Sequence, residues 1–210
     1  MLSASCVISS AASLPSSKAA SGMSRARIGL LFGSFNPVHT GHLILAEHFA
    51  TRTDLAKVWL VVSPHSPFKE AADLRPDAER LHLVQLAIAG NSRLRAEDIE
   101  FGLPRPSYTI ATLDALRQRH PDTDFVLLMG GDNLPGLPRW HEAARLLAEI
   151  DIYVYPRPGP PLPDMAAFPR AQVMAAPLLD ISATYIRESL RLGRSIRYLV
   201  PAVVEAELLK

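Results

Sequence analysis

The sequence predicts an α/β protein with a doubly wound, mainly parallel sheet in a single domain. Short, continuously apolar segments alternate along the chain with longer segments whose apolar residues recur at helical spacing. The apolar segments lack polar alternation, which is typical of strands buried on both faces. The 210-residue chain is 48% hydrophobic, enough for one sizeable core. Strands that alternate with helices pair in parallel through right-handed crossovers.

Each strand is predicted from its own apolar run. The four clearest are RIGLLF (27–32), KVWLVVS (57–63), DFVLLMG (124–130) and DIYVYP (151–156). A shorter run, AQVMAA (171–176), is a candidate for a fifth. Helical patterns fill the intervals at 39–51, 78–89, 109–120, 141–148, 184–192 and from residue 202. Because ligands of such sheets bind at the carboxyl ends of the strands, residues that directly follow a strand are the first candidates for a site.

Composition limits the partners of the protein. Lys+Arg 22 against Asp+Glu 21 gives a formal net charge of +1, so we expect no nucleic-acid partner and local binding of any anionic ligand. A single cysteine, Cys6, excludes an internal disulfide framework and fits the cytoplasm. No stretch after residue 27 reaches the ~18 apolar residues that span a bilayer, so we expect no membrane partner. The oligomeric state, monomer or small homo-oligomer, is not readable.

Three segments stand apart from the periodic pattern. Residues 1–25 are rich in Ser and Ala and lack acidic residues, and we expect a disordered extension ahead of a domain spanning 26–210. The proline-containing segment 63–77 carries Lys69 and Arg75 after a strand, which favours a mobile cationic lid. The proline-rich segment 156–169 is typical of a stiffened surface connection.

The stretch GSFNPVHTGH (33–42) combines features that core packing does not need. Gly33 allows a turn without a Cβ, and Thr40 is a candidate N-cap of the next helix. His39 and His42 then lie three residues apart at the helix start, where unpaired N–H groups and the helix dipole favour an anion. The stretch therefore predicts a phosphate site.

A metal site is the alternative reading of the two histidines, and we predict none. No third ligand falls at a recognised spacing, and HEAAR (141–145) lacks the second histidine of H-E-x-x-H. The other histidines are expected to be solvated or to cap helices. They are His48, His65, His82, His120 and His141.

A second constellation lies at DISATYIRESLRLG (180–193). Ser182 or Thr184 can cap a helix that carries Arg187 in its first turn and ends at Gly193. Hydroxyl groups, unpaired amides and a guanidinium thus meet at another helix N-terminus, which is again suited to phosphate. Two such sites suggest a nucleoside triphosphate.

The two motifs together resemble those of the nucleotidyltransferase family with H-x-G-H and I-S-S-T-x-I-R signatures. Within it, the bacterial nicotinate mononucleotide adenylyltransferases are most similar. Three further segments carry that likeness, which spans 27–210: PSYTIATLDAL, LLMGGDNLPGLPRW and RYLVPAVVEAELL. The resemblance implies a Rossmann-like nucleotidyltransferase fold. It also implies transfer of the adenylyl group of ATP to nicotinate mononucleotide in NAD biosynthesis, with Mg²⁺ carried on ATP and pyrophosphate and deamido-NAD as products.

The resemblance also implies roles for individual residues. His39, His42, Arg187 and Lys69 would act on the ATP phosphates during catalysis. The remaining ATP-binding residues would be Gly33, Ser34, Phe35, Asp132, Ile181, Ser182 and Thr184. The residues implied to bind nicotinate mononucleotide are Asn36, Ser107, Tyr108, Thr109 and Trp140.

The sequence departs from the family pattern at three places. Ala183 stands for the second serine of I-S-S-T, Ala111 replaces the aspartate of T-I-D-T-L, and SPHSPFK replaces P-P-H-K, which leaves the position of Lys69 open. Two alternatives stay open. One is another adenylyl- or cytidylyltransferase of the same fold, such as pantetheine-phosphate adenylyltransferase. The other is a nucleotide sensor without turnover. The sequence does not separate nicotinate from nicotinamide.

Overall fold

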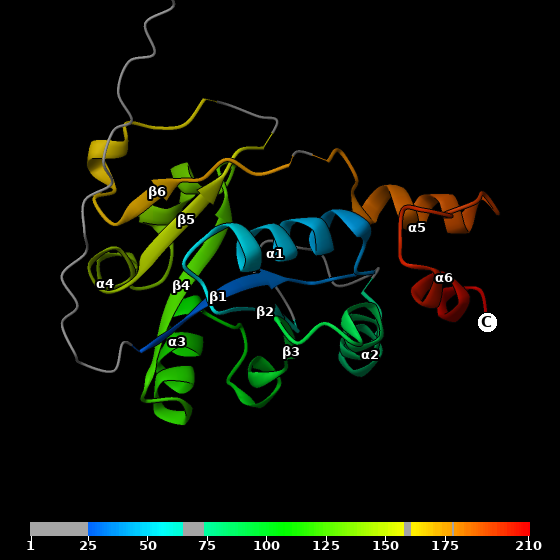
Figure 1. The fold of residues 1–210 in the computed structure, drawn as a ribbon, viewed down its shortest axis with the longest axis horizontal. Coiled ribbons are helices and arrows are strands. Elements are labelled where there is room, and N and C mark those ends of the chain that lie inside the picture. Colours follow the sequence, from blue (N-terminus) through cyan, green and yellow to red (C-terminus); the bar gives the residue numbers. More distant parts are fainter. Residues whose placement is uncertain (1–24, 65–73, 158–160, 178) are drawn as a thin grey trace, which may run out of the picture.

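A six-stranded parallel sheet forms the centre of the computed structural model, which describes residues 25–64, 74–157, 161–177 and 179–210 (Figure 1). The strand order is β3-β2-β1-β4-β5-β6, and every neighbouring pair runs in parallel. The strands are β1 (Ala26–Gly33), β2 (Lys57–Val62), β3 (Leu94–Glu97), β4 (Thr123–Gly130), β5 (Asp151–Tyr155) and β6 (Ala171–Val173).

Helices connect the strands on both faces of the sheet. Within the described residues the α-helices are α1 (Thr40–Arg52), α2 (Asp77–Ile88), α3 (Thr109–Arg119), α4 (Ala143–Glu149), α5 (Ala183–Arg191) and α6 (Ala202–Leu208). Short 3-10 helices are η2 (Ile99–Gly102), η3 (Leu134–Arg139) and η4 (Met165–Ala167). None of the helices in the described ranges has the length and apolar character needed to cross a membrane.

Alternate residues of the central strands enter two separate cores. Leu31 and Leu128 pack with residues of α1, α2, α5 and α6. Leu30 and Leu127, their neighbours in sequence, pack on the opposite face with residues of α3 and α4. Because each strand is apolar on both faces, its sequence reads as a continuous run. The prediction of a doubly wound parallel sheet is confirmed.

The sequence analysis missed the edge strand β3. Its residues, Leu94 to Glu97, include two charged side chains and form no apolar run. Glu97 is nonetheless buried and forms an ion pair with Arg95, with 3.0 Å between Oε2 and Nη2. Since β3 pairs with β2 alone, it needs little apolar sequence of its own, and an apolar-run criterion passes over it.

The strand order reverses between β1 and β4. From β1 the chain moves outward through β2 to β3 and then returns to place β4 on the other side of β1. The two crossovers leave in opposite directions, so their loops diverge above the carboxyl ends of β1 and β4. Such a point is where open α/β sheets bind their ligands.

Candidate active site

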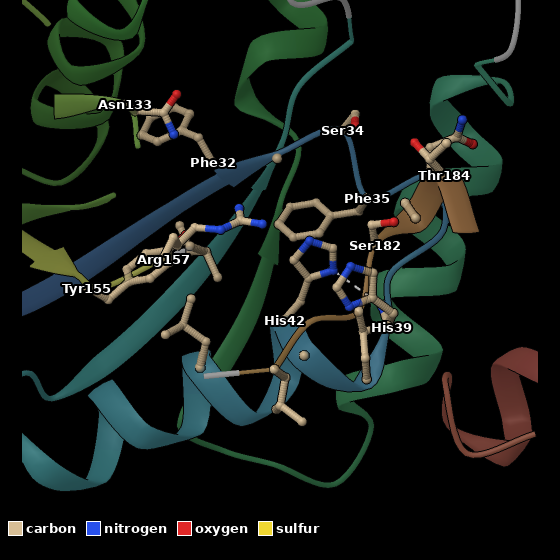
Figure 2. A pocket seen from close by; sticks show the side chains of 18 of the residues that line it. Phe32, Ser34, Phe35, His39, His42, Asn133, Tyr155, Arg157, Ser182 and Thr184 are labelled. Carbon is tan, nitrogen blue, oxygen red and sulfur yellow. Dashed lines mark hydrogen bonds between the residues drawn. The ribbon is translucent and has the colours of Figure 1, made fainter. Parts of the chain in front are cut away.

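Two cavities meet at the carboxyl ends of β1 and β4. The first has a volume of about 640 Å³ and lies among the β1–α1 loop, α1 and the start of α5 (Figure 2). The second has a volume of about 380 Å³ and is lined by the start of α3 and the end of η3. The residues that border both are Phe32, Gly33, Ser34, Asn133 and Tyr155. A molecule in one cavity can therefore touch a molecule in the other.

The loop after β1 is shaped by Gly33 and Phe35. Phe35 adopts a φ of 43°, in the left-handed region that non-glycine residues rarely occupy. Its ring folds back over Gly33, where a Cβ would come within 2.9 Å of the ring. The Phe35 ring is 2% exposed and meets the His42 ring edge-on, with 4.9 Å between centroids. The buried Phe35 ring therefore packs against the His42 ring and helps to fix its position.

His39, and not Thr40, is the N-cap of α1. The extended backbone of His39 places its N–H 3.3 Å from Nδ1 of His42, which accepts it. Thr40 is instead the first helical residue, and its hydroxyl donates to the Tyr198 carbonyl at 3.0 Å. Because Nδ1 of His42 accepts a hydrogen bond, a neutral His42 carries its proton on Nε2.

His39 is held in its neutral form. Its side chain is 6% exposed, and burial lowers its pKa to about 4, with the positive charge of Arg157 acting in the same direction. Nδ1 of His39 is buried and has no hydrogen-bond partner among the described residues. At Gly41 a Cβ would lie 3.1 Å from this nitrogen. A buried polar atom left unsatisfied in a cavity wall suits contact with a ligand.

The second predicted motif meets the first in space. Ser182 is the N-cap of α5, and its hydroxyl accepts the N–H of Tyr185 at 3.2 Å. Arg187 reaches back to the β1–α1 loop, where its Nη1 donates to the Asn36 carbonyl at 3.0 Å, while Nη2 lies 3.4 Å from the Thr184 hydroxyl. Nε of Arg187 is buried and has no partner in the described part of the chain. Two helix N-termini thus face one cavity.

Arg157 is a functional candidate that the sequence analysis missed. It follows β5 at the carboxyl edge of the sheet and lines the first cavity beside Tyr155 (Figure 2). The sequence analysis expected a surface connection at 156–169 and assigned it no role in the site, but Pro156 and Arg157 both line the cavity. The rule that residues following a strand are site candidates would have found Arg157, but the surrounding prolines favoured a plain loop.

The second cavity is aromatic and partly polar. Trp140 lines it, and Tyr108 stacks on His141 with 4.2 Å between ring centroids. His141 is exposed, as expected of a solvated histidine, and it also lines this cavity. Such a surface suits a flat ring.

Glu100 is a buried acid in the wall of this cavity, and no sequence motif pointed to it. It is 2% exposed, and its Oε1 accepts the Thr112 hydroxyl at 2.7 Å. Burial raises the pKa of Glu100, while the hydroxyls of Thr112, Ser63 and Ser107 act in the opposite direction.

Most of the predicted residues gather at the two cavities. The first is lined by Gly33, Ser34, Phe35, Asn36, His39, His42, Ile181, Ser182, Thr184 and Arg187. The second is lined by Ser107, Tyr108, Thr109 and Trp140. Asn36 therefore borders the first cavity, although it was expected with the second group. Asp132 is exposed and lines neither, whereas its neighbour Asn133 borders both. Lys69 and His65 lie outside the described residues.

The described polar side chains that line the first cavity are mainly hydrogen-bond donors, and they do not form a metal-binding cluster. Within residues 25–64, 74–157, 161–177 and 179–210, no group of three or more His, Cys, Asp or Glu side chains could hold a metal ion. The first cavity is instead lined by imidazole, guanidinium and hydroxyl groups. These groups bind phosphate oxygens.

A family profile and individual relatives were both found to match this chain. The profile of the cytidylyltransferase-like family matches residues 30–189. The "Probable nicotinate-nucleotide adenylyltransferase" of Bacteroides fragilis is 48% identical over 182 residues, covering 86% of this chain and 90% of that protein. The protein of the same name from Cytophaga hutchinsonii is 47% identical over 179 residues, covering 85% and 93%.

Solved structures show the same fold at low sequence identity. The nicotinic acid mononucleotide adenylyltransferase of Plasmodium falciparum complexed with NaAD superposes with a TM-score of 0.73 at 18% identity, covering 88% of this chain and 95% of that one. The same enzyme complexed with APC gives a TM-score of 0.72 at 17% identity, covering 88% and 94%.

Proposed function

The chain belongs to the cytidylyltransferase-like family and, within it, to the nicotinate-nucleotide adenylyltransferases, and from this premise we propose that it transfers the adenylyl group of ATP to nicotinate mononucleotide. The products are nicotinate adenine dinucleotide and pyrophosphate, and the reaction is a step of NAD biosynthesis. We place the reaction in the cytoplasm, which the single cysteine of the sequence fits.

The shared wall of the two cavities is the observation that carries this proposal. Phe32, Gly33 and Ser34 border both cavities at the end of β1. The first cavity, with its two helix N-termini, suits the triphosphate of ATP, and the second, with its aromatic side chains, suits the nicotinate ring. In this arrangement the α-phosphate of ATP and the phosphate of the mononucleotide meet at the β1–α1 loop.

The reaction needs alignment and charge stabilisation from the protein. A phosphate oxygen of nicotinate mononucleotide attacks the α-phosphorus in line, a new P–O bond forms, and the bond to the β-phosphate bridging oxygen breaks. The attacking phosphate is anionic at neutral pH, so no general base is required. Catalysis then comes from holding two anions together and stabilising charge in the transition state.

Individual residues take roles that follow from their positions. His42 donates from Nε2 to the α-phosphate, and His39 donates as a neutral imidazole. Ser182, Thr184 and Arg187 bind the β- and γ-phosphates, and Arg157 adds a second cation from the opposite wall. Lys69 lies outside the described residues, and its proposed role as a further cation for the triphosphate rests on the family resemblance.

The other proposed roles concern the metal and the acceptor. Mg²⁺ would be held by ATP phosphates and water, as this ion prefers, and would supply charge neutralisation at the leaving pyrophosphate. The backbone of Ser107 to Thr109 holds the nicotinate carboxylate at the N-terminus of α3, and the Trp140 ring stacks on the pyridine ring. Asn133, which borders both cavities, takes the adenosine role first expected of Asp132.

Pyrophosphate release tests the proposed function. The protein is incubated with ATP and Mg²⁺ and, in parallel, with nicotinate mononucleotide, nicotinamide mononucleotide, phosphopantetheine or no acceptor; a second series replaces ATP with CTP. We expect turnover with ATP and a preference for nicotinate mononucleotide. Preference for another acceptor or for CTP would assign the protein to a different transferase of the family, and no turnover in any reaction would favour a sensor.

A further inference from the structure

Arg80 on α2 is a fully buried arginine that lines neither cavity. Its side chain is 0% exposed, and all five of its guanidinium N–H groups are used. Nε donates to the Arg75 carbonyl at 3.0 Å, and Nη2 donates to the Pro64 carbonyl at 3.2 Å and to Oδ1 of Asp77 at 2.6 Å. Nη1 donates to the carbonyls of Ser34 and Ser63, the latter at 2.8 Å.

The two Nη1 contacts join the ends of neighbouring strands. The β1–β2 ladder closes with the N–H of Ser63, which donates to the Gly33 carbonyl at 2.9 Å. Beyond this bond the two strands continue into different loops, and Arg80 bridges the next two carbonyls, those of Ser34 and Ser63. Ser34 borders both cavities and Ser63 borders the second. One guanidinium therefore fixes the spacing between two walls of the site.

The same contact sustains a strained backbone. Phe35, directly after Ser34, has a φ of 43°, which a bulky residue keeps only when its surroundings hold it. In a planar trans peptide the carbonyl and the following N–H point in opposite directions, so the Ser34 carbonyl bonded to Arg80 fixes the direction of the Phe35 N–H. Two residues on, the Asn36 carbonyl is held by Arg187 and its side-chain oxygen by the Arg75 N–H.

Charge balance alone does not explain this arrangement. Asp77 would satisfy the charge of any cation at position 80, but it accepts only one of the five guanidinium hydrogens. The other four go to carbonyl groups of three separate segments, a pattern that requires the planar fork of arginine. A lysine side chain ends one bond short of the position of Nη1, and its single nitrogen carries three donors, so it cannot bind the two strand-end carbonyls together with Asp77 and the carbonyls of Arg75 and Pro64.

We propose that Arg80 is a positioning residue for the transfer reaction: by joining Ser34 and Ser63 it sets the distance and orientation between the two bound substrates. This inference rests on the proposed function. It predicts a specific kinetic signature, because alignment of the reacting groups affects the chemical step more than the binding of either substrate alone.

The test compares Arg80→Lys with the unaltered chain, using kcat for pyrophosphate release and the dissociation constant of ATP. We expect kcat per folded molecule to fall at least tenfold while ATP affinity changes less than threefold. Val84→Ala, a buried truncation on the same helix away from the cavities, is the control and should lower Tm but leave kcat within twofold. A kcat of Arg80→Lys within threefold of normal would overturn the positioning role.

A second variant covers the case in which Arg80→Lys does not fold. Asp77→Ala changes a partly exposed side chain and removes the carboxylate oxygen that accepts from Nη2 of the guanidinium. A fall in kcat of threefold or more at unchanged ATP affinity supports the inference, and an unchanged kcat overturns it. If the unaltered chain releases no pyrophosphate with any acceptor, the proposed function fails instead, so the two failures are distinguishable.

Discussion

The imidazole rings of His39 and His42 are stacked, with 3.6 Å between centroids and 25° between planes. The His39 N–H donates to Nδ1 of His42, so the two residues of the H-x-x-H pattern are coupled through backbone as well as side chain. The two ring nitrogens of His42 therefore have different roles. Nδ1 accepts a backbone N–H at the start of α1, and Nε2 is the nitrogen that we propose to contact the substrate.

His42→Asn separates these two tasks. An asparagine oxygen can take the place of Nδ1 and keep the bond to the His39 N–H, but nothing replaces Nε2. We expect turnover to fall by about two orders of magnitude or more, the scale of a lost transition-state donor. His42→Ala should lose the same activity and, in addition, about 1 kcal/mol of stability from the lost cap. Steady-state kinetics with thermal unfolding measures both, and near-normal turnover of folded His42→Asn would contradict the assignment.

The buried His39 should make stability depend on pH. Its pKa is about 6.5 in the unfolded chain and about 4 in the folded one, so the unfolded chain binds the proton more readily. The free energy of unfolding should therefore fall as pH decreases from about 6.5 towards 4, by at most about 3 kcal/mol. Denaturant titrations at pH 7 and pH 5 measure it. The change in the free energy of unfolding between pH 7 and pH 5 should be smaller in His39→Asn than in the unaltered chain. An equal change in the two proteins would disprove the effect.

Gly41→Ala should separate stability from activity. The new Cβ would lie 3.1 Å from Nδ1 and 3.2 Å from Cε1 of His39, so the ring must shift by a few tenths of an ångström. Alanine is favoured over glycine in a helix by up to about 1 kcal/mol, so Tm should stay equal or rise. We expect turnover to fall about tenfold, because small misplacements of aligned groups are costly. Unchanged turnover would show that the ring position is not critical.

Arg157→Gln tests the cation of the cavity wall by two readouts. The positive charge of Arg157 contributes to the low pKa of His39, so its removal should raise that pKa, which NMR titration of the His39 ring measures. The KM for ATP should rise about tenfold, as expected when a charged hydrogen bond is lost. Arg170→Gln is the matched control, since Arg170 pairs with Asp151 at the amino ends of β5 and β6, away from the carboxyl end that carries Arg157, and should change neither.

Glu100→Gln should stabilise the protein at high pH. Burial raises the pKa of Glu100, so the folded state favours the neutral carboxyl group over the carboxylate. The stability of the folded state that depends on this neutral form is lost as pH rises through the folded pKa. Glutamine is neutral at all pH values and retains an oxygen for the Thr112 hydroxyl. The free energy of unfolding at pH 8 should exceed that of the unaltered chain, and the difference should shrink towards pH 4. A constant difference over this range would point to packing instead.

The central part of the fold was readable from the sequence because its residues carry strong local signals. The continuous apolar runs of β1 and β4 reflect burial on two faces, and the cap and stop of α5 at Ser182 and Gly193 are set by hydrogen bonding and by a φ of 64°. The two helix-start motifs, at residues 33–42 and 180–193, were found for the same reason, since a helix start is specified by a few adjacent residues.

Tertiary structure alone decided which distant groups meet. No sequence spacing brings Arg187 to the Asn36 carbonyl, places Arg157 beside His39, or selects Asn133 over Asp132 for the cavity wall. Each of these depends on the strand order, which puts the carboxyl ends of β1, β4 and β5 side by side. The low pKa of His39 and the burial of Arg80 likewise depend on packing from several elements, because desolvation is a property of the assembled surroundings and not of the local sequence.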